Sequence, residues 1–218
     1  MLFLNPLQPE PAALDAVRRH LDSGGVVAMP TDTVYGLVAN ASDAEAVGRV
    51  FALKGRSFQN PLPLVVRDLA QAAEIACALP PVFATLTAAF WPGPLTLIVA
   101  AGERLAPAVT AGTGNVGMRQ PNLPLLAQLL AGVGYPLTAT SANRSGQPEC
   151  RTGAAVAAQL DGEGLLVVEG GLSPLALPST ILDLTGAGTP RLVRAGAIAT
   201  SDLEACLGAP IPGSIRVS

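Results

Sequence analysis

The sequence predicts a single mixed α/β domain. Short apolar segments that suit buried strands alternate along the chain with segments of helical periodicity, as expected for helices packed on a sheet. A length of 218 residues is enough for one buried core, and no internal repeat, low-complexity tract or linker divides the chain. We therefore expect one domain that spans residues 1–218.

The composition is strongly apolar, with 50% hydrophobic and 13% charged residues, which raises the question of a membrane segment. The longest uncharged segment, residues 75–102, contains four prolines. A spanning helix needs about twenty uninterrupted apolar residues. We therefore predict that no part of the chain crosses a membrane.

The cysteines and the N-terminus predict a cytoplasmic protein. The first ten residues lack the basic segment and apolar core of a secretory signal. The three cysteines, Cys77, Cys150 and Cys206, are widely spaced, and their odd number fits reduced thiols. The formal net charge of −3 argues against a surface that binds nucleic acid as a whole, but it is compatible with a local basic cavity.

The chain contains one histidine, His20, and this excludes several kinds of catalytic site. A Ser-His-Asp triad and a Cys-His pair need a histidine beside the nucleophile, and an HExxH zinc site needs two. His20 lies in the first helical pattern, among residues typical of a surface. Cations, hydroxyls and amides must therefore carry any chemistry, and we assign no metal-ligating residue.

The N-terminal part of the chain predicts a helix, a strand and a polar loop. Residues 11–23 have helical periodicity, and Gly24 and Gly25 end this helix because glycine readily takes the left-handed conformation. Val26–Met29 suits a short buried strand. Pro30–Gly36 then places hydroxyls at the carboxyl end of a strand, where α/β proteins bind ligands. The same residues are also typical of turns.

A second predicted helix ends at the only lysine of the chain. Ser42 and Glu45 match a capping box, and Gly55 ends the helix directly after Lys54. Every other cationic side chain is an arginine, so a compact ammonium group here suggests a point charge meant for a ligand. A cation that offsets the helix dipole is the alternative. Arg56 then lies in the following loop.

The middle of the chain predicts two strands that flank a broken helical region. Leu62–Val66 and Leu95–Val99 are apolar runs of strand length. Between them, residues 68–90 have helical character, and the prolines at Leu79–Pro81 interrupt it.

Gly112–Gly117 matches the GxGxxG pattern of dinucleotide-binding proteins, but its surroundings argue against such a site. That fingerprint requires a helix directly after the glycines. Here residues 118–121, Met-Arg-Gln-Pro, predict a strand followed by a turn. The chain also lacks the GxxxxGK[ST] pattern of P-loops.

The predicted strand at residues 137–140 leads into Ser141-Ala142-Asn143. Ser141 has neither a GxSxG context nor a base, so we do not predict a nucleophile. In extended backbone the side chains of Ser141 and Asn143 would point the same way. The remaining predicted elements are helices at 122–130, 152–160 and 201–206, and strands at 165–168, 180–184 and 190–195.

Six motifs, taken together, resemble those of the YrdC-like threonylcarbamoyl-adenylate synthases. They occur in the family's order over about residues 12–200, nearly the whole chain. The resemblance implies a short single-domain form in which a twisted mixed sheet with flanking helices surrounds a basic concave cavity. The motifs are Pro30–Leu37, Lys54–Arg56 with Asn60–Leu62, Val116–Arg119, Ser141–Asn143 with Ser145–Gly146, Ser179–Thr180 and Arg194–Ile198.

The resemblance implies a reaction of L-threonine, bicarbonate and ATP, with Mg²⁺, that gives threonylcarbamoyl-AMP and pyrophosphate. A partner transferase would then move the threonylcarbamoyl group to an adenosine of tRNA, which the protein itself could also contact. The amine of threonine and carbon dioxide give a carbamate whose oxygen attacks the α-phosphate, so the protein must align reactants and stabilise charge. No protein nucleophile is needed, in agreement with the shortage of histidine.

The resemblance also implies roles for single residues. The catalytic residues would be Lys54, Arg56, Ser141 and Asn143. The residues that bind L-threonine would be Thr33, Arg119, Ser141 and Ser179. The residues that bind ATP would be Lys54, Arg56, Asn60, Asn115, Asn143, Arg151 and Arg194. Asp32 is a candidate ligand of Mg²⁺, although phosphates and water alone could carry the metal.

Two alternatives remain open at this point. Another carbamoylating or adenylating enzyme of the same fold would use the same cations, and the amino acid is open because Val65 stands where many members carry a threonine-side histidine. The second alternative is an RNA-binding module, whose affinity would fall steeply with salt. The acidic net charge and the 4% of aromatic residues disfavour such a module.

Overall fold

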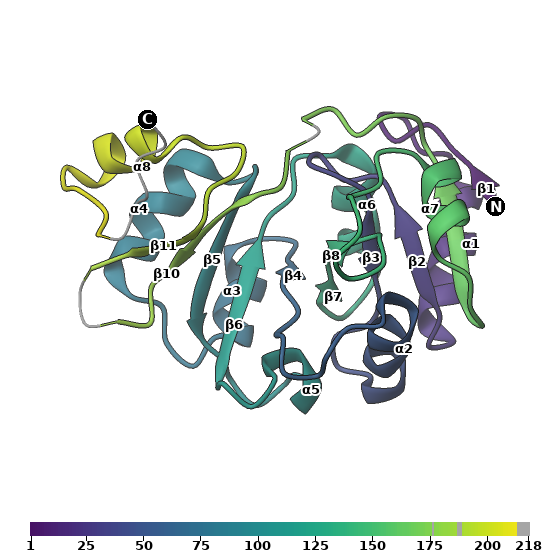
Figure 1. Cartoon of the computed structure of the whole chain (residues 1–218), viewed down its shortest axis with the longest axis horizontal. Coiled ribbons are helices and arrows are strands. Elements are labelled where there is room, and N and C mark those ends of the chain that lie inside the picture. The colour runs from purple at the N-terminus through teal and green to yellow at the C-terminus, as the bar shows by residue number, and fades with distance from the viewer. Residues whose placement is uncertain (176, 187–188, 213–218) are drawn as a thin grey trace.

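Two mixed sheets and the helices around them form the molecule (Figure 1). This arrangement comes from a computed structural model, which describes residues 1–175, 177–186 and 189–212. The predicted α/β class is confirmed, and hydrogen bonding divides its strands between two sheets. Among the described residues, no helix combines the length and the apolar character that crossing a membrane requires.

The first sheet contains five strands in the order β1-β9-β2-β3-β8. The strand β9 pairs in parallel with β1 and β2, whereas β3 pairs antiparallel with β2 and β8. Both faces of β2 are buried, because Val26 and Ala28 pack into one apolar cluster while Val27 and Met29 pack into another. The bounds of these strands are β1 Leu2–Phe3, β2 Val26–Met29, β3 Gly36–Val38, β8 Thr140–Ser141 and β9 Leu165–Glu169.

The second sheet contains six strands in the order β11-β10-β5-β6-β4-β7. Its central strand pair is antiparallel, with Leu97 opposite Met118, and β10 joins β5 in parallel. The bounds of these strands are β4 Leu64–Val65, β5 Leu95–Ala100, β6 Asn115–Arg119, β7 Leu137–Thr138, β10 Thr180–Asp183 and β11 Arg191–Arg194.

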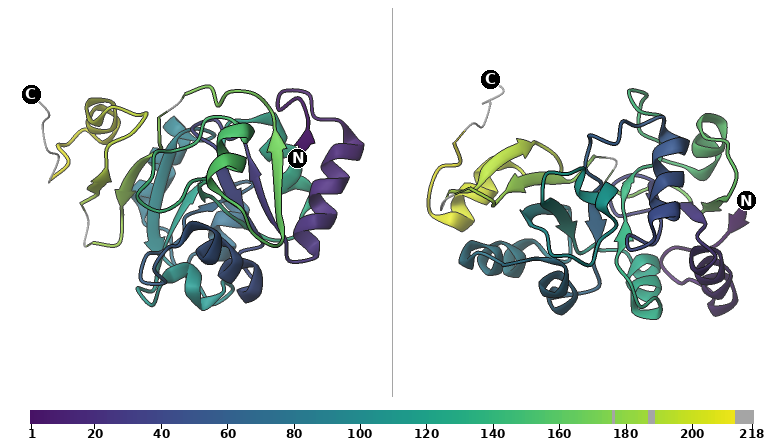
Figure 2. Two further views of the ribbon diagram at one scale, coloured as in Figure 1. Left: turned by 45° about the vertical axis from the view of Figure 1, so that its right-hand side comes forward. Right: turned by 90° about the horizontal axis from the view of Figure 1, so that it is seen from below.

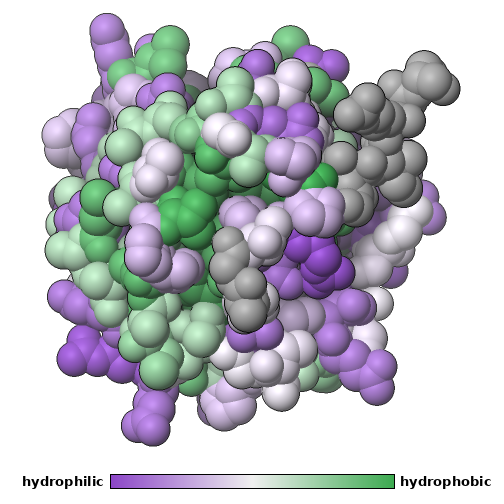
Figure 3. Space-filling view, turned by 90° about the vertical axis from the view of Figure 1, so that its left-hand side faces the viewer, coloured by the Kyte–Doolittle hydropathy of each residue, from purple (hydrophilic) through white to green (hydrophobic). Residues whose placement is uncertain are grey.

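Helices lie around the two sheets and at both ends of the molecule (Figures 1 and 2). The N-terminal strand and α1 lie at one end, and α8 packs with α4 at the other. At the α4–α8 end, apolar residues gather over one part of the face beside hydrophilic ones (Figure 3), and α4 contains no charged residue. The helices are α1 Pro11–Asp22, α2 Ala44–Lys54, α3 Leu69–Ile75, α4 Pro81–Phe90, α5 Pro107–Thr110, α6 Pro124–Gly132, α7 Gly153–Gln159 and α8 Thr200–Leu207.

The start of α2 differs by one residue from the prediction. Asp43, not Ser42, is the N-cap, and its carboxylate accepts hydrogen bonds from the amides of Glu45 and Ala46 at 2.9 and 3.2 Å. The carboxylate satisfies two amides that the helix leaves without partners, and its charge suits the helix N-terminus. The predicted capping box is therefore wrong, whereas the predicted end at Gly55 is confirmed by its φ of 57°.

The predicted strand at residues 137–140 is divided between the two sheets. Leu137 and Thr138 pair with β4 in the second sheet, whereas Thr140 and Ser141 pair with β3 in the first. Between them, the amide of Ala139 donates to the carbonyl of Pro63 at 2.8 Å. This segment therefore carries Ser141 across the join between the sheets.

We predict that Gly196→Ala lowers the free energy of unfolding by about 1–3 kcal/mol, the usual cost of overpacking. A Cβ at Gly196 would lie 2.4 Å from the carbonyl oxygen of Pro178 and 2.5 Å from the carbonyl carbon of Ser179, so the backbone before β10 must shift. Gly134→Ala is the control, since a Cβ there meets no atom within 4 Å, and it should change stability by less than about 0.5 kcal/mol. Urea unfolding measures both, and equal effects would contradict the prediction.

Candidate active site

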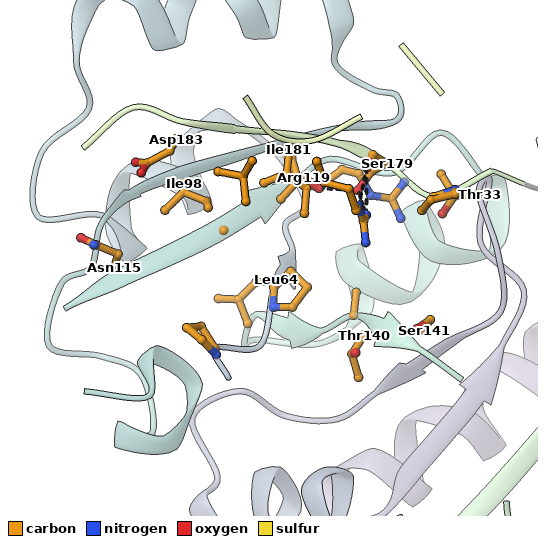
Figure 4. Close-up of a pocket in the computed structure, with 18 of the residues that line it drawn as sticks. Thr33, Leu64, Ile98, Asn115, Arg119, Thr140, Ser141, Ser179, Ile181 and Asp183 are labelled. Atoms are coloured by element: carbon orange, nitrogen blue, oxygen red, sulfur yellow. Dashed lines mark hydrogen bonds between the residues drawn. The ribbon is translucent and has the colours of Figure 1, made fainter. Parts of the chain in front are cut away.

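A cavity of about 400 Å³ draws its walls from both sheets. Alternate residues of a strand face the same side, so Thr96 and Ile98 of β5 line it together with Asn115, Gly117 and Arg119 of β6. In Figure 4, Thr33, Arg119 and Ser179 gather at one end of the cavity, which we call the first end. Asn115 and Asp183 lie at the other end, which we call the far end, and Thr140 and Ser141 face Arg119 from the first sheet.

A buried ion pair forms the base of the first end. Arg119 donates through Nη1 to Oδ1 of Asp32, and the two side chains are only 7% and 5% exposed. The amide of Asn122 donates to Oδ2 of Asp32 at 3.2 Å. Both carboxylate oxygens are therefore in use. In this arrangement Asp32 is paired with Arg119.

Hydroxyl groups complete the first end. Thr33 lines the cavity, and its hydroxyl hydrogen-bonds to that of Thr31 at 2.9 Å. Ser179, directly before β10, hydrogen-bonds through its hydroxyl to Thr96 at 2.8 Å. Arg194 of β11 donates to that same hydroxyl at 3.0 Å and to the carbonyl of Ser179 at 2.8 Å. The structure thus brings together Ser179 and Arg194, to which the family resemblance gives different substrates.

Lys54 lies behind the cavity wall with its side chain almost completely buried. Its ammonium group donates to the carbonyls of Ser141 and Asn143, the second at 2.8 Å, and to the side-chain oxygen of Asn143 at 3.3 Å. Burial, and then the charge of Arg56, lower the pKa of Lys54 to about 8. The charge of Glu149 acts in the opposite direction. Lys54 therefore holds the turn that presents Ser141 to the cavity.

Ser141 and Asn143 do not point the same way, in contrast to the prediction. Ser141 lines the cavity, whereas the side-chain amide of Asn143 donates to the carbonyls of Arg144 and Gln147 at 3.1 and 2.6 Å. The backbone is not extended here, because the amide of Asn143 donates to the carbonyl of Ser141 in a tight turn. Asn143 thus shapes the turn from behind.

The other predicted site residues divide between the cavity wall and the surface. Arg56 lines the wall, and its guanidinium donates to the carbonyls of Pro61 at 3.0 Å and Asn60 at 3.3 Å. Asn115 lines the far end. The side chains of Asn60 and Arg151 are exposed and lie outside the residues that line the cavity. Val65 is completely buried beside Arg119 in the strand register.

Sequence reasoning missed several polar residues of the wall, and four of them illustrate what signal was available. Thr96 could have been found, since it is the polar residue in an otherwise apolar strand. Asp183 and Arg191 lie opposite each other on β10 and β11 and form an ion pair at 2.9 Å. Glu149 is exposed on the wall. Burial lowers the pKa of both Lys54 and Arg194, and the charge of Glu149 partly offsets that effect. The motifs gave no signal for Glu149, Asp183 or Arg191.

The charges of the wall favour an anionic ligand. Four arginines line the cavity against two carboxylates, which leaves an excess of positive charge. Low-dielectric walls lined by one sign of charge concentrate ligands of the opposite sign. Among the described residues, no group of three histidine, cysteine, aspartate or glutamate side chains could hold a metal ion. The arginines are Arg56, Arg119, Arg191 and Arg194, and the carboxylates are Glu149 and Asp183.

Comparison with known proteins points to one family. The model of the Sua5/YciO/YrdC family, which carries the description "Telomere recombination", matches residues 19–196. The chain is 40% identical over 184 residues to the threonylcarbamoyl-AMP synthase of Bacillus subtilis, covering 84% of this chain and 53% of that protein. It is 35% identical over 179 residues to the threonylcarbamoyl-AMP synthase of Chromohalobacter salexigens, covering 82% of this chain and 94% of that protein.

A solved structure shows the same arrangement of strands and helices. The crystal structure of P. abyssi Sua5 complexed with L-threonine superposes with a TM-score of 0.91 at 32% identity. The match covers 97% of this chain and 62% of that one. The chain thus spans about half of the B. subtilis relative and under two thirds of the archaeal one.

We expect Asp32→Asn to lower the free energy of unfolding by about 3–5 kcal/mol, because it leaves the guanidinium of Arg119 buried without a counter-charge. Urea unfolding at neutral pH measures the effect. Glu74→Gln removes the exposed ion pair with Arg104 at 3.5 Å and should cost at most about 1 kcal/mol. The double variant Asp32→Asn/Arg119→Met should cost less than the sum of the single variants. Additive costs would contradict a coupled pair.

The lowered pKa of Lys54 predicts a pH dependence of stability. The folded-state pKa of about 8 lies below the usual 10.5, so between these values the unfolded chain binds more protons. The contribution of Lys54 to stability should therefore be fully present above pH 10.5 and be lost as pH falls through 8. We expect the difference in urea midpoint between the wild type and Lys54→Met to widen from pH 8 to pH 10. Parallel pH profiles would show that Lys54 titrates normally.

Proposed function

The chain belongs to the Sua5/YciO/YrdC family, and on this premise we propose that it forms threonylcarbamoyl-AMP and pyrophosphate from L-threonine, bicarbonate and ATP. The observation that carries the proposal is that the residues expected to bind both substrates line one cavity with an excess of arginines. The expected threonine-binding residues there are Arg119, Ser141 and Ser179, and the expected ATP-binding residues are Arg56 and Arg194. A carboxylate, a carbamate and a chain of phosphates are all anions. A wall of this charge suits all three.

The first end of the cavity would bind the amino acid. The P. abyssi relative was crystallised with L-threonine, and this chain matches that structure over 97% of its length. Arg119 would pair with the substrate carboxylate through the nitrogens that Asp32 leaves free, since a guanidinium offers five donors. The hydroxyls of Thr33, Ser141 and Ser179 would contact the side chain or the carbamoyl group of the substrate.

ATP would occupy the rest of the cavity. Its phosphates would contact Arg56 and Arg194, and another part of the nucleotide would lie near Asn115 at the far end. Arg194 touches Ser179, so an α-phosphate on Arg194 would meet the carbamate at the boundary between the two substrates. Lys54 and Asn143 would act by fixing the turn of Ser141. Asn60 and Arg151 lie outside the described residues that line the cavity, so they would contact ATP only if part of the nucleotide extends out of the cavity.

The residues present need only align and stabilise the reactants. Bicarbonate takes up a proton and loses water to give carbon dioxide, and the amine of threonine adds to the carbon dioxide and loses a proton to give a carbamate. The carbamate oxygen then attacks the α-phosphorus, the bond to the β-phosphate oxygen breaks, and pyrophosphate leaves with its charge. Fixed guanidinium groups stabilise the charge that develops, and bound orientation supplies the remaining rate enhancement.

Magnesium would enter with the nucleotide rather than occupy a protein site. It prefers oxygen ligands and usually binds through phosphates with one or two carboxylates. Asp32 is engaged with Arg119, and Asp183 with Arg191. Among the described residues of the wall, Glu149 is the carboxylate outside an ion pair and would be the one to approach the metal. Bound magnesium would neutralise phosphate charge.

The product is a reactive mixed anhydride, which suits transfer to another enzyme. We place this protein in the cytoplasm, upstream of a threonylcarbamoyl transferase that modifies an adenosine of tRNA. Direct contact of the chain with tRNA remains part of the same proposal.

The test is pyrophosphate release by the purified protein with ATP, magnesium and bicarbonate, with the adenylate followed by mass spectrometry. We expect release that depends on L-threonine and a product of matching mass. Release with a different amino acid would instead indicate a related enzyme with another substrate. RNA binding that weakens steeply with salt, without nucleotide binding, would indicate the RNA-binding module and overturn the proposal.

Arg56→Ala provides the variant arm of this assay. In the proposal Arg56 would donate two charge-assisted hydrogen bonds to the phosphates, and each such bond contributes about 1.5–3 kcal/mol. Its loss should therefore lower kcat/KM for ATP by about 100-fold or more. Arg104→Ala removes an exposed arginine outside the cavity and should leave turnover unchanged. Circular dichroism checks that both variants fold. Near wild-type turnover by Arg56→Ala would refute its assignment.

A further inference from the structure

Tyr35 connects four segments around the first end of the cavity, although its side chain does not line the cavity. The residue is completely buried. Its amide donates to the carbonyl of Cys150 at 3.1 Å, and its carbonyl accepts from the amide of Ala142 at 2.7 Å. Its hydroxyl donates to the carbonyl of Gly171 at 2.8 Å and accepts from the amide of Gly170 at 3.1 Å. Tyr35 thus links the turn of Ser141 to the segment that follows β9.

Glu169, the last residue of β9, uses both carboxylate oxygens in the same network. Oε1 accepts from the amide of Gly171 at 2.9 Å. It also lies 3.2 Å from the hydroxyl of Tyr35, whose single hydrogen is shared between Oε1 and the carbonyl of Gly171. Oε2 accepts from the amide of Ala154 in α7 at 2.9 Å. A Cβ at Gly153 would lie 2.9 Å from Oε2, so this approach requires glycine. The burial of Tyr35 raises its pKa to about 12, and its hydroxyl remains a donor at neutral pH.

The segment that this network holds, residues 170–175, is called the strap. The strap makes two further backbone contacts, from the amide of Ser173 to the carbonyl of Arg151 at 3.3 Å and from the amide of Leu175 to the carbonyl of Asp32 at 3.1 Å. Its leucines bury little surface, since Leu172 and Leu175 are 66% and 44% exposed. Polar contacts therefore contribute much of what holds the strap, and the hydroxyl of Tyr35 makes two of them.

The strap contacts the residue on which the first end is built. Leu175 donates to the carbonyl of Asp32, whose carboxylate holds Arg119 and whose neighbour is Thr33. We propose that Tyr35 and Glu169 form a latch that fixes the strap against this end of the cavity, and that both are positioning residues for the amino acid substrate. This inference rests on the proposed function where it places the amino acid at that end.

Hydrogen exchange in the substrate-free protein tests the latch without any assumption about activity. In Tyr35→Phe, the amides of Gly171, Ser173 and Leu175 should exchange at least about fivefold faster, while those of β5 keep their wild-type rates. The chain has one other tyrosine, and Tyr135→Phe makes the same chemical change outside the cavity, where the hydroxyl donates to Asp22 at 2.6 Å. Unchanged exchange of the strap in Tyr35→Phe would overturn the latch.

Steady-state kinetics test the positioning role. Tyr35→Phe should raise KM for L-threonine about fivefold to tenfold, while KM for ATP stays within about twofold. The reason is that the strap reaches the support of the cavity wall through Asp32 at the first end, whereas its other contact is with the backbone of Arg151, whose side chain lies outside the wall. Tyr135→Phe should leave both constants unchanged. Equal rises in both KM values would indicate a general structural role and overturn the proposal. If the wild type shows no turnover that depends on threonine, the proposed function and the positioning role both fail. The hydrogen-exchange measurement then still tests whether Tyr35 and Glu169 hold the strap.

Glu169→Gln gives a second, independent entry to the same network. The side-chain amide of glutamine has about the size of the carboxylate, but its NH2 group is a donor. Depending on its orientation, this group would face either the amide of Ala154 or the amide of Gly171 and the hydroxyl of Tyr35, which are donors themselves. It should reproduce both effects of Tyr35→Phe. The double variant should raise KM for L-threonine by little more than either single variant, because either change alone already disrupts the hydrogen bonds of the latch. Multiplicative effects would show that the two residues act separately and would overturn the proposal.

Discussion

The buried ion pair of Asp32 and Arg119 joins the two halves of the molecule. Asp32 follows β2 of the first sheet, and Arg119 ends β6 of the second. Removing two charges from water is costly, and each charge is tolerable in the interior only while the other stays in place. The pair therefore ties the relative position of the sheets to the chemistry of the cavity, because Arg119 also lines its wall.

The polar wall is organised by its own hydrogen bonds. Arg194, Ser179 and Thr96 form one connected set, and Lys54 fixes the turn of Ser141 from behind. Side chains that are already held in place lose less conformational freedom when a ligand binds. Electrostatic stabilisation is also most effective when the donors do not have to reorganise during the reaction. The wall is thus suited to a reaction that needs alignment more than a nucleophile.

The family match contains every described residue of the cavity wall. It extends over residues 19–196, and the described lining residues run from Thr33 to Arg194. The chain covers 94% of the C. salexigens relative and 53% of the B. subtilis one. The region that the family model matches therefore includes every described wall residue that the proposed chemistry uses.

The sequence by itself determined the local elements. The apolar run at Val26–Met29, the helix end at Gly55 and the strand at Met118 and Arg119 are all confirmed, because periodicity and glycine conformation act over a few residues. The tertiary structure decided which side chains meet. Asp32 and Arg119 are 87 residues apart in the chain. The ammonium group of Lys54 donates to backbone carbonyls 87 and 89 residues away, and the side chain of Asn143 points away from the cavity. Periodicity shows which face of an element is buried, but only the packing of the two sheets supplies the partner.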